Sequence, residues 1–455
     1  MPASVIPDGA GGTFDISQPA SAEVLASLKK EFQAGEGLAW YFLPKEERYR
    51  QGPGLTGDEV LNDLKSGRFV EDGKHVDFIY GFYTQNVTKL YRLYRASGDP
   101  WYLDQIVKYA EGIEWLLENQ PQRLLPLERR GASPKDPVST IPHEPAALAN
   151  FWAPVNAARL LLERAKEARL PANDSTVLKA KRLLGLSVQY MASQITADYK
   201  DLPLRRGEAP VPFEPGVRTL ELRENFGIPA RAAQVIEYTP WNQTFFYFAV
   251  LAGATRALED LQEIEGGIAY QSYIELYRNV VKAGMWSLQN ENICVVREGV
   301  PYFFHMHTPL RDKEVKSRLG FPMFSGEDVS HSTSGTWNLP YIWEAGEDFG
   351  VTPALLAGYA NAMLLSLREA AMTDKKGNPV PRMHLDSPWY LAASGRENFP
   401  WSGMKGRYYA LMPFCPEIVA ANRPWSRNNN IWENPGELNR LYASYLYRLW
   451  MERCE

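Results

Sequence analysis

The stretch GEDVSHSTSGTWNLPYIWEAGEDFGVTPALL, residues 326–356, contains the pattern that decides the fold. Its first part is polar and carries two acids, a histidine and a tryptophan. Two apolar segments with helical spacing follow, at residues 337–347 and from residue 353 onward. Gly350 is typical of a helix end, and Thr352 and Pro353 are typical of a helix start. The stretch therefore predicts a helical hairpin that is reached through a polar segment.

The same unit recurs along the chain. A helix predicted from His75 ends at Gly98, and Asp99 and Pro100 begin the next one. Further predicted helices cover residues 145–164, 177–195, 241–261, 270–288 and 435–451. One helix of a pair is apolar on nearly all sides, as in FFYFAVLAGA at 245–254, whereas its partner is amphipathic. Buried helices that alternate with exposed ones predict an inner and an outer layer.

Other segments interrupt this helical pattern. Two β-rich runs in ICVVREGVPYFFHMHT, residues 293–308, flank a turn at Arg297-Glu298-Gly299 and predict a β-hairpin. Residues 1–22 are rich in Pro, Gly and Ser, and we expect an irregular leader there. Residues 199–236 and 372–430 are Pro- and Gly-rich connections, and connections of such length are usually functional or disordered. We expect residues 23–455 to form a single catalytic domain.

Composition limits the classes of partner. The net charge of the 455 residues is −5 and no basic tract stands out, which argues against nucleic acid or an anionic membrane surface. No apolar stretch is long enough to span a bilayer. The three cysteines lie far apart, so no disulfide framework is predicted. The N-terminus lacks the features of a secretory signal, which predicts a cytoplasmic protein, or a secreted or periplasmic one if a signal has been removed.

Polar and aromatic residues gather in a lead-in segment before each predicted inner helix. In a ring of hairpins all inner helices point the same way, so these segments are expected to meet at one mouth. The lead-in segments are DGKH at 72–75, IPHEP with His143 and Glu144, EYTPWNQ with Glu237, Tyr238, Trp241, Asn242 and Gln243, GEDVSHS with Glu327, Asp328 and His331, and RNNNIWENP at 427–435.

This arrangement resembles the α/α-toroid proteins, a barrel of helical hairpins shared by many glycoside hydrolases, polysaccharide lyases and sugar epimerases. The resemblance covers residues 75–452 and rests on the hairpins and their lead-in segments. It implies an all-α toroid, a complete or incomplete ring of about five to seven hairpins, with a small β-hairpin and long decorated loops. It also implies a carbohydrate substrate and a site at the mouth of the inner helices.

His331 is the strongest candidate for catalysis. Serines and a threonine surround it, so its imidazole could act as a general base, with Glu327 or Asp328 orienting it. The alternative is a histidine that stabilises the loop. Tyr238 is a candidate acid or base, although tyrosines more often serve packing.

Asn242 and Gln243 follow Trp241 at a predicted helix start. Their amides could bind a substrate carboxylate and stabilise its enolate, or they could cap the helix. His143 and Glu144 lie between two prolines, a rigid segment that suits either the mouth or a solvated loop.

The segment GMKGRYYALMP, residues 403–413, offers a further contact to an acidic substrate. Arg407 could bind a carboxylate in a bidentate way with Tyr408 beside it, or it could be a surface arginine on an edge strand or in a turn. Trp241, Trp337, Trp401 and Trp432 are candidates for stacking on sugar rings.

No cofactor and no metal site are predicted. His305 and His307 alternate on a predicted strand, but no third ligand is evident. The chain also lacks GxGxxG in a βαβ setting, GxxxxGK[ST], GxSxG and HExxH, which argues against nucleotide, serine-hydrolase and zinc-protease functions.

The leading hypothesis is a lyase that cleaves a uronate-containing polysaccharide or oligosaccharide by β-elimination. The amides or Arg407 would neutralise the carboxylate, His331 or a tyrosine would remove the C5 proton, and a tyrosine would protonate the leaving oxygen. The alternative on the same fold is a glycoside hydrolase with two carboxyl groups from among Glu144, Glu237, Glu327 and Asp328. A sugar epimerase and a protein-binding helical-repeat scaffold are further alternatives.

Overall fold

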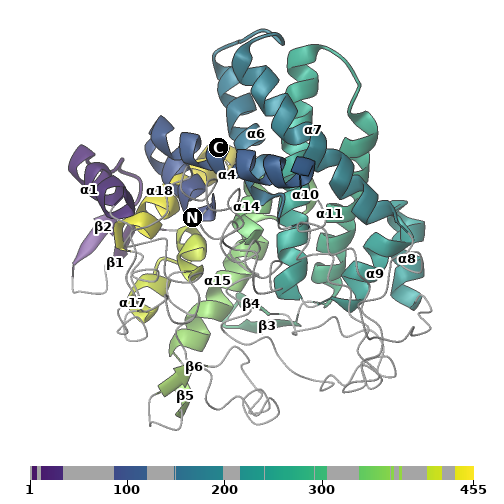
Figure 1. Ribbon diagram of the computed structural model, residues 1–455. Helices are drawn as coiled ribbons and strands as arrows, with labels where there is room; N and C mark the ends of the chain where they lie inside the picture. The colour runs from purple at the N-terminus through teal and green to yellow at the C-terminus, as the bar shows by residue number, and fades with distance from the viewer. Residues whose placement is uncertain are drawn as a thin grey trace, which may run out of the picture. The chain divides into compact units, whose positions relative to one another are not determined.

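The computed structural model describes residues 3–7, 12–33, 87–119, 148, 150–197, 216–239, 241–291, 293–304, 338–368, 370–373, 379–381, 407–422 and 436–454. Helices dominate these residues, which confirms the all-α class, and the strands among them form three two-stranded antiparallel pairs (Figure 1). The chain divides into two compact units. We call residues 25–235 and 246–283 the hairpin unit, and residues 1–24, 236–245 and 284–455 the mixed unit.

Helices build the hairpin unit, and some of them continue into residues of the mixed unit. They are α1 (Ala22–Gln33), a helical segment at residues 87–97, α4 (Pro100–Asn119), α6 (Trp152–Glu167), α7 (Ser175–Thr196), α8 (Val217–Phe226), α9 (Ala230–Tyr238), α10 (Trp241–Glu265) and α11 (Gln271–Glu291).

The junction between the segment 87–97 and α4 has the predicted chemistry. Gly98 has a φ of +69°, a conformation that favours glycine, and its amide donates to the Tyr94 carbonyl at 2.7 Å. The Asp99 carboxylate then accepts a hydrogen bond from the Trp101 amide at 2.9 Å, and α4 begins at Pro100. The predicted helix end and the following helix start are therefore confirmed.

The segment 87–97, α6 and α10 meet near their N-terminal ends. The Trp152 indole nitrogen donates to the Thr88 hydroxyl at 3.0 Å, and this bond joins the first turns of the segment and α6. Trp152 also contacts Phe246 on α10, whose ring lies edge-on with its centroid 6.2 Å away. One buried tryptophan thus contacts the beginnings of both neighbouring helices.

The same three helices also meet near their C-terminal ends. Arg95 donates to the Glu163 carboxylate at 2.8 Å, and Lys166 donates to the Asp260 carboxylate at 2.7 Å. Because neighbours touch both near their starts and near their ends, the three helices run in the same direction. These contacts confirm the shared direction that was predicted for neighbouring inner helices.

Burial separates these helices from their partners. Residues 152–162 of α6 and 246–255 of α10 are buried without interruption. By contrast, α7 buries one face that includes Val177, Leu184 and Met191 and exposes the other. The predicted alternation of an apolar helix with an amphipathic one is present in these hairpins.

The amphipathic helices form a second layer. The Tyr277 hydroxyl on α11 donates to the Val188 carbonyl on α7 at 2.6 Å, and Lys179 on α7 pairs with Glu111 on α4 at 3.0 Å. In Figure 1, α6, α7, α10 and α11 lie side by side, with the α6–α7 and α10–α11 turns at the same end. The hairpins therefore stack as two layers, with the more deeply buried helices in one of them.

The mixed unit combines short strands with helices. Its elements are β1 (Val5–Pro7), β2 (Thr13–Asp15), β3 (Ile293–Arg297), β4 (Val300–Phe304), α14 (Asn338–Ala345), the 3-10 helix η3 (Glu347–Phe349), α15 (Pro353–Arg368), β5 (Ala370–Thr373), β6 (Pro379–Pro381), the 3-10 helix η5 (Arg407–Phe414), α17 (Ile418–Asn422) and α18 (Gly436–Cys454).

The N-terminal leader is more ordered than expected. Strands β1 and β2 pair there, and Ile6 and Ile16 are fully buried in a cluster with Met412, Ala443 and Tyr447. Strands of three residues are too short to show an alternating pattern, so composition alone suggested an irregular segment. Helices α8 and α9 likewise lie in residues 199–236, which the sequence indicated as a connection.

The predicted β-hairpin is confirmed. Strands β3 and β4 pair with Arg297 opposite Val300, and Glu298 and Gly299 form the turn with φ of 52° and 80°. Positive φ at both central residues is the geometry that suits a two-residue hairpin. The Asn361 amide on α15 donates to the Pro301 carbonyl at 3.1 Å, which attaches the hairpin to this helix.

The quoted stretch also folds largely as predicted where the structure describes it. All eight residues of α14 are buried. Gly350 has a φ of +87°, and the Thr352 hydroxyl accepts from the Leu355 amide at 3.1 Å as α15 begins.

Within the described residues, no helix is both long and apolar enough to cross a membrane.

Candidate functional site

The structure tests few of the predicted site residues directly. The residues that lie outside its described part are His143, Glu144, Glu327, Asp328, His331, Trp337, Trp401 and Trp432. A second group has a described backbone whose side chains are not described, namely Tyr238, Asn242, Gln243, Arg407 and Tyr408. The roles predicted for these residues stay predictions.

Backbone positions still locate part of the third lead-in segment. Helix α9 ends at Tyr238 and α10 begins at Trp241, so residues 237–243 form the joint between two helices. Asn242 and Gln243 lie in the first turn of α10, where amide groups can serve as caps or face a ligand. Arg407 and Tyr408 lie in the first turn of η5 rather than on an edge strand.

Three side chains of this joint are described, those of Glu237, Thr239 and Trp241, and all three are buried. The Trp241 side chain is 1% exposed, and its ring lies 5.8 Å from that of Phe245. The free ring face that stacking on a sugar needs is therefore absent at Trp241 in this structure. Glu237 is 4% exposed, and a buried carboxyl group requires hydrogen bonds or a counter-charge.

The segment 87–97, α6 and α10 are in contact at residues 88, 152 and 246, as the contacts of Trp152 with Thr88 and Phe246 show. The segment with His143 and Glu144 precedes α6, and the joint at 237–243 leads into α10. Residues 241–243, at the end of one lead-in segment, therefore lie in the first turn of α10, whereas His143 and Glu144 lie outside the described residues.

The opposite end of the same helices carries an ionic cluster that the sequence analysis missed. Glu163 on α6 accepts from Arg95 on the neighbouring segment and from Arg159 one turn earlier on α6. Burial acts to raise the pKa of Glu163, but the two guanidinium groups outweigh it and hold the pKa at about 2. Glu163 is therefore ionised at every physiological pH.

A second group of charges extends this cluster across α10. Lys166 bonds Asp260 at 2.7 Å and Glu263 at 2.6 Å, and Arg256 lies 3.3 Å from Asp260. Burial raises the pKa of Asp260 despite these two cations, since its side chain is 1% exposed. Burial lowers the pKa of Lys166, but its bonds to Asp260 and Glu263 outweigh this and raise it.

Sequence spacing could have indicated part of this cluster. Arg159 and Glu163, like Arg256 and Asp260, are four residues apart on predicted helices. The partners on neighbouring helices are not readable from such spacing, because they depend on how the helices pack. The cluster closes the end of the inner layer and has the composition of a structural ion-pair network.

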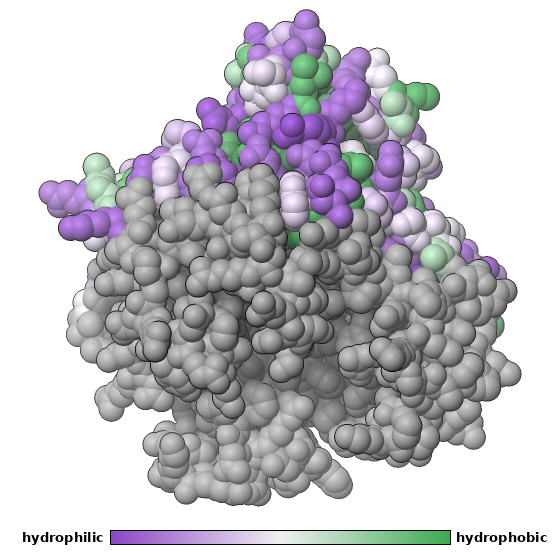
Figure 2. Space-filling model, in the orientation of Figure 1, coloured by the Kyte–Doolittle hydropathy of each residue, from purple (hydrophilic) through white to green (hydrophobic). Residues whose placement is uncertain are grey.

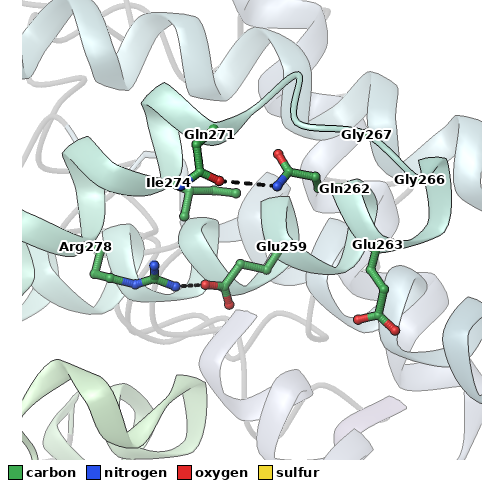
Figure 3. A pocket seen from close by; sticks show the side chains of 8 residues that line it. All are labelled: Glu259, Gln262, Glu263, Gly266, Gly267, Gln271, Ile274 and Arg278. Carbon is green, nitrogen blue, oxygen red and sulfur yellow. Dashed lines mark hydrogen bonds and ion pairs between the residues drawn. The ribbon is translucent and has the colours of Figure 1, made fainter.

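A hollow of about 460 Å³ opens at the turn between α10 and α11 (Figure 3). An ion pair between Glu259 and Arg278 lies on one side of it, and the Gln262 amide donates to Gln271 at 3.3 Å on the other. Gly266 and Gly267 form its edge. The polar groups satisfy one another across the hollow, which favours a structural role for them.

A second hollow, of about 230 Å³, lies between α7 and α11, and we call it the α7–α11 groove. Leu258 and Leu261 of α10 also line it, and each of them is 1% exposed. Its rim carries Lys181 and Gln189 of α7 and Tyr273 of α11. Aromatic, aliphatic and hydrogen-bonding groups together are typical of ligand sites.

No cluster of three or more His, Cys, Asp or Glu residues that could hold a metal ion occurs among the residues that the structure describes. No protein-family model, curated protein or solved structure matches the chain.

Proposed function

We propose that the chain is a carbohydrate-active enzyme built on an α/α toroid, and that it cleaves a uronate-containing polysaccharide or oligosaccharide by β-elimination. The observation that supports this is the shared direction of the segment 87–97, α6 and α10, as expected of inner helices whose lead-in segments meet at one mouth. Polar residues that are separated by about a hundred positions in sequence can then serve one substrate.

The proposed reaction needs three groups at that end. A base, His331 or Tyr238, takes the proton from C5 of the uronate, and the electron pair forms a double bond between C4 and C5. The bond from C4 to the leaving oxygen breaks, and a tyrosine gives this oxygen a proton. Asn242, Gln243 or Arg407 would bind the carboxylate and stabilise the enolate as it forms.

A glycoside hydrolase is the second candidate, and the burial of Glu237 favours it. Glycosidases use two carboxyl groups on either side of the scissile bond, one of which is held protonated in many of them. Glu237 is 4% exposed at the joint before α10, in the lead-in segment. Glu144, Glu327 and Asp328 are the candidates for its partner.

Product analysis distinguishes these reactions. Purified protein would be incubated with alginate, polygalacturonate and hyaluronate, and with neutral glucans and xylans. The proposal predicts ultraviolet absorbance from a conjugated double bond with at least one uronate polymer. Reducing sugar from a neutral glycan, without this absorbance, would contradict it in favour of the hydrolase. If neither signal arises, β-elimination of these uronates is also contradicted.

A further inference from the structure

We propose that the α7–α11 groove is a second carbohydrate site, which holds a uronate sugar of the same polymer outside the catalytic mouth. The uronate identity of the ligand rests on the proposed function. The groove itself is defined by residues of the hairpin unit and does not include any of the predicted catalytic residues.

A row of tyrosines on α11 faces α7 along the groove. Tyr277 is buried and donates to the Val188 carbonyl at 2.6 Å, which fixes this end of the row. Tyr273 lies next to it with ring centroids 6.3 Å apart and is half-buried. Tyr270, immediately before the first residue of α11, is half-buried and lines the groove together with Lys181. The row thus presents partly exposed rings on a rigid helix.

Gly185 of α7 lines the groove together with Tyr273, and its lack of a side chain leaves room there. It lies in the interior of α7, where glycine is less favourable than alanine. A Cβ atom at Gly185 would meet nothing within 4 Å, so close packing does not require the glycine, and its φ is not in the left-handed region. The effect of the missing side chain is a space beside Tyr273.

The groups around this space match the two faces of a sugar. The half-buried ring of Tyr273 can accept the apolar C–H face of a pyranose ring. The Gln189 amide, exposed on the same face of α7, can exchange hydrogen bonds with hydroxyl groups.

Lys181 supplies a hydrogen-bond donor for a uronate carboxylate. Its side chain is 47% exposed, and its ammonium donates to Glu265 at 2.6 Å. An ammonium group carries three N–H donors, so donors remain for a carboxylate oxygen. Because Glu265 already balances the charge, Lys181 would act through this hydrogen bond more than through a net positive field.

Binding assays with matched variants test the site. The probes are size-defined oligosaccharides of alginate and polygalacturonate, with cello-oligosaccharides as the neutral comparison, and the readout is isothermal titration calorimetry on the full chain. Gly185→Leu fills the space, and Tyr273→Ala removes the ring. Leu178→Ala is the control, since Leu178 is 51% exposed on α7 and does not line the groove. Each variant is first checked for wild-type helicity by circular dichroism.

The proposal predicts that Gly185→Leu and Tyr273→Ala each weaken uronate binding about tenfold or more, while Leu178→Ala leaves it unchanged. Wild-type binding that both groove variants leave unchanged would overturn the site, as would binding only to cello-oligosaccharides or no binding at all. The rate of β-elimination on a short oligosaccharide is measured in the same variants from the absorbance of the double bond. This rate depends on the catalytic mouth and not on the groove. Loss of groove binding with intact elimination therefore separates the two proposals.

Discussion

Lys166 on α6 and Asp260 on α10 form an ion pair of 2.7 Å, and each lies fourteen positions after one member of the Trp152–Phe246 ring contact. Fourteen residues of α-helix span about 21 Å, so the two helices stay in register over that distance. This pairing is the clearest sign that the inner helices run in one direction. Which residues hold the register can be tested by substitution.

Lys166→Ala should reduce the stability of the protein. The change leaves the buried Asp260 carboxylate with Arg256 as its remaining described cation, and breaking such a pair is costly. We expect the free energy of unfolding, measured with urea, to fall by about 2 kcal/mol. The control is Lys181→Ala at the more exposed pair with Glu265, where a loss below about 1 kcal/mol is expected. Equal losses at both positions would contradict the special role of Lys166.

Glu163 should make stability depend on acid pH. Its pKa of about 2 is lower than the usual 4.5, so its contribution is complete above pH 4.5 and is lost as the pH falls through 2. We expect a difference of roughly 3 kcal/mol between wild type and Glu163→Gln near neutral pH, which narrows below pH 4.5. Urea unfolding at a series of pH values measures it. A difference that stays constant down to pH 2 would show that Glu163 acts by packing alone.

Gly358→Ala should loosen the β3–β4 hairpin from α15. A Cβ atom at Gly358 would lie 2.2 Å from the Phe303 ring, closer than any real contact, so the ring would have to move. Overpacking of this kind costs about 1–3 kcal/mol, measurable as a lower midpoint in urea. Adding Phe303→Leu to Gly358→Ala should restore part of the loss. No loss in the single variant would mean that the hairpin adjusts freely.

Gly185→Ala should stabilise the protein, in contrast to Gly358→Ala. The glycine is exposed within α7 and a Cβ atom has open space there, so the gain in helix propensity should raise the free energy of unfolding by roughly 0.5–1 kcal/mol. Thermal unfolding followed by circular dichroism measures this gain. A loss of stability would show that the backbone at Gly185 is constrained in a way that its surroundings do not reveal.

Local chemistry made much of the fold predictable. Two helix boundaries were predictable because they depend on local preferences: a glycine with positive φ ends one helix, and a capping side chain starts the next. These pairs are Gly98 with Asp99 and Gly350 with Thr352. The β3–β4 turn at Glu298-Gly299 was readable for the same reason. By contrast, the strands of the leader depend on burial of Ile6 and Ile16 against Met412 and Tyr447, residues distant in sequence, and no local pattern predicts such contacts.

The candidate site was less predictable than the fold. The position of Trp241 at a helix start predicted a ring that could stack on a sugar. Its burial against Phe245 depends on packing, which the local sequence does not indicate. The ionic cluster around Glu163 and Asp260 depends in the same way on which helices become neighbours. Gly185 carries no sign in sequence of whether it serves packing or opens a groove.

The role of His331 in the proposed elimination is the central claim, and the products of variants test it most directly. Absorbance from the double bond would be followed with the best uronate polymer for wild type, His331→Ala, Tyr238→Phe and the surface control Leu178→Ala. The account predicts that wild type and Leu178→Ala form the unsaturated product, that His331→Ala loses at least a hundredfold in rate, and that Tyr238→Phe also slows. Unsaturated product at the wild-type rate from His331→Ala would contradict it.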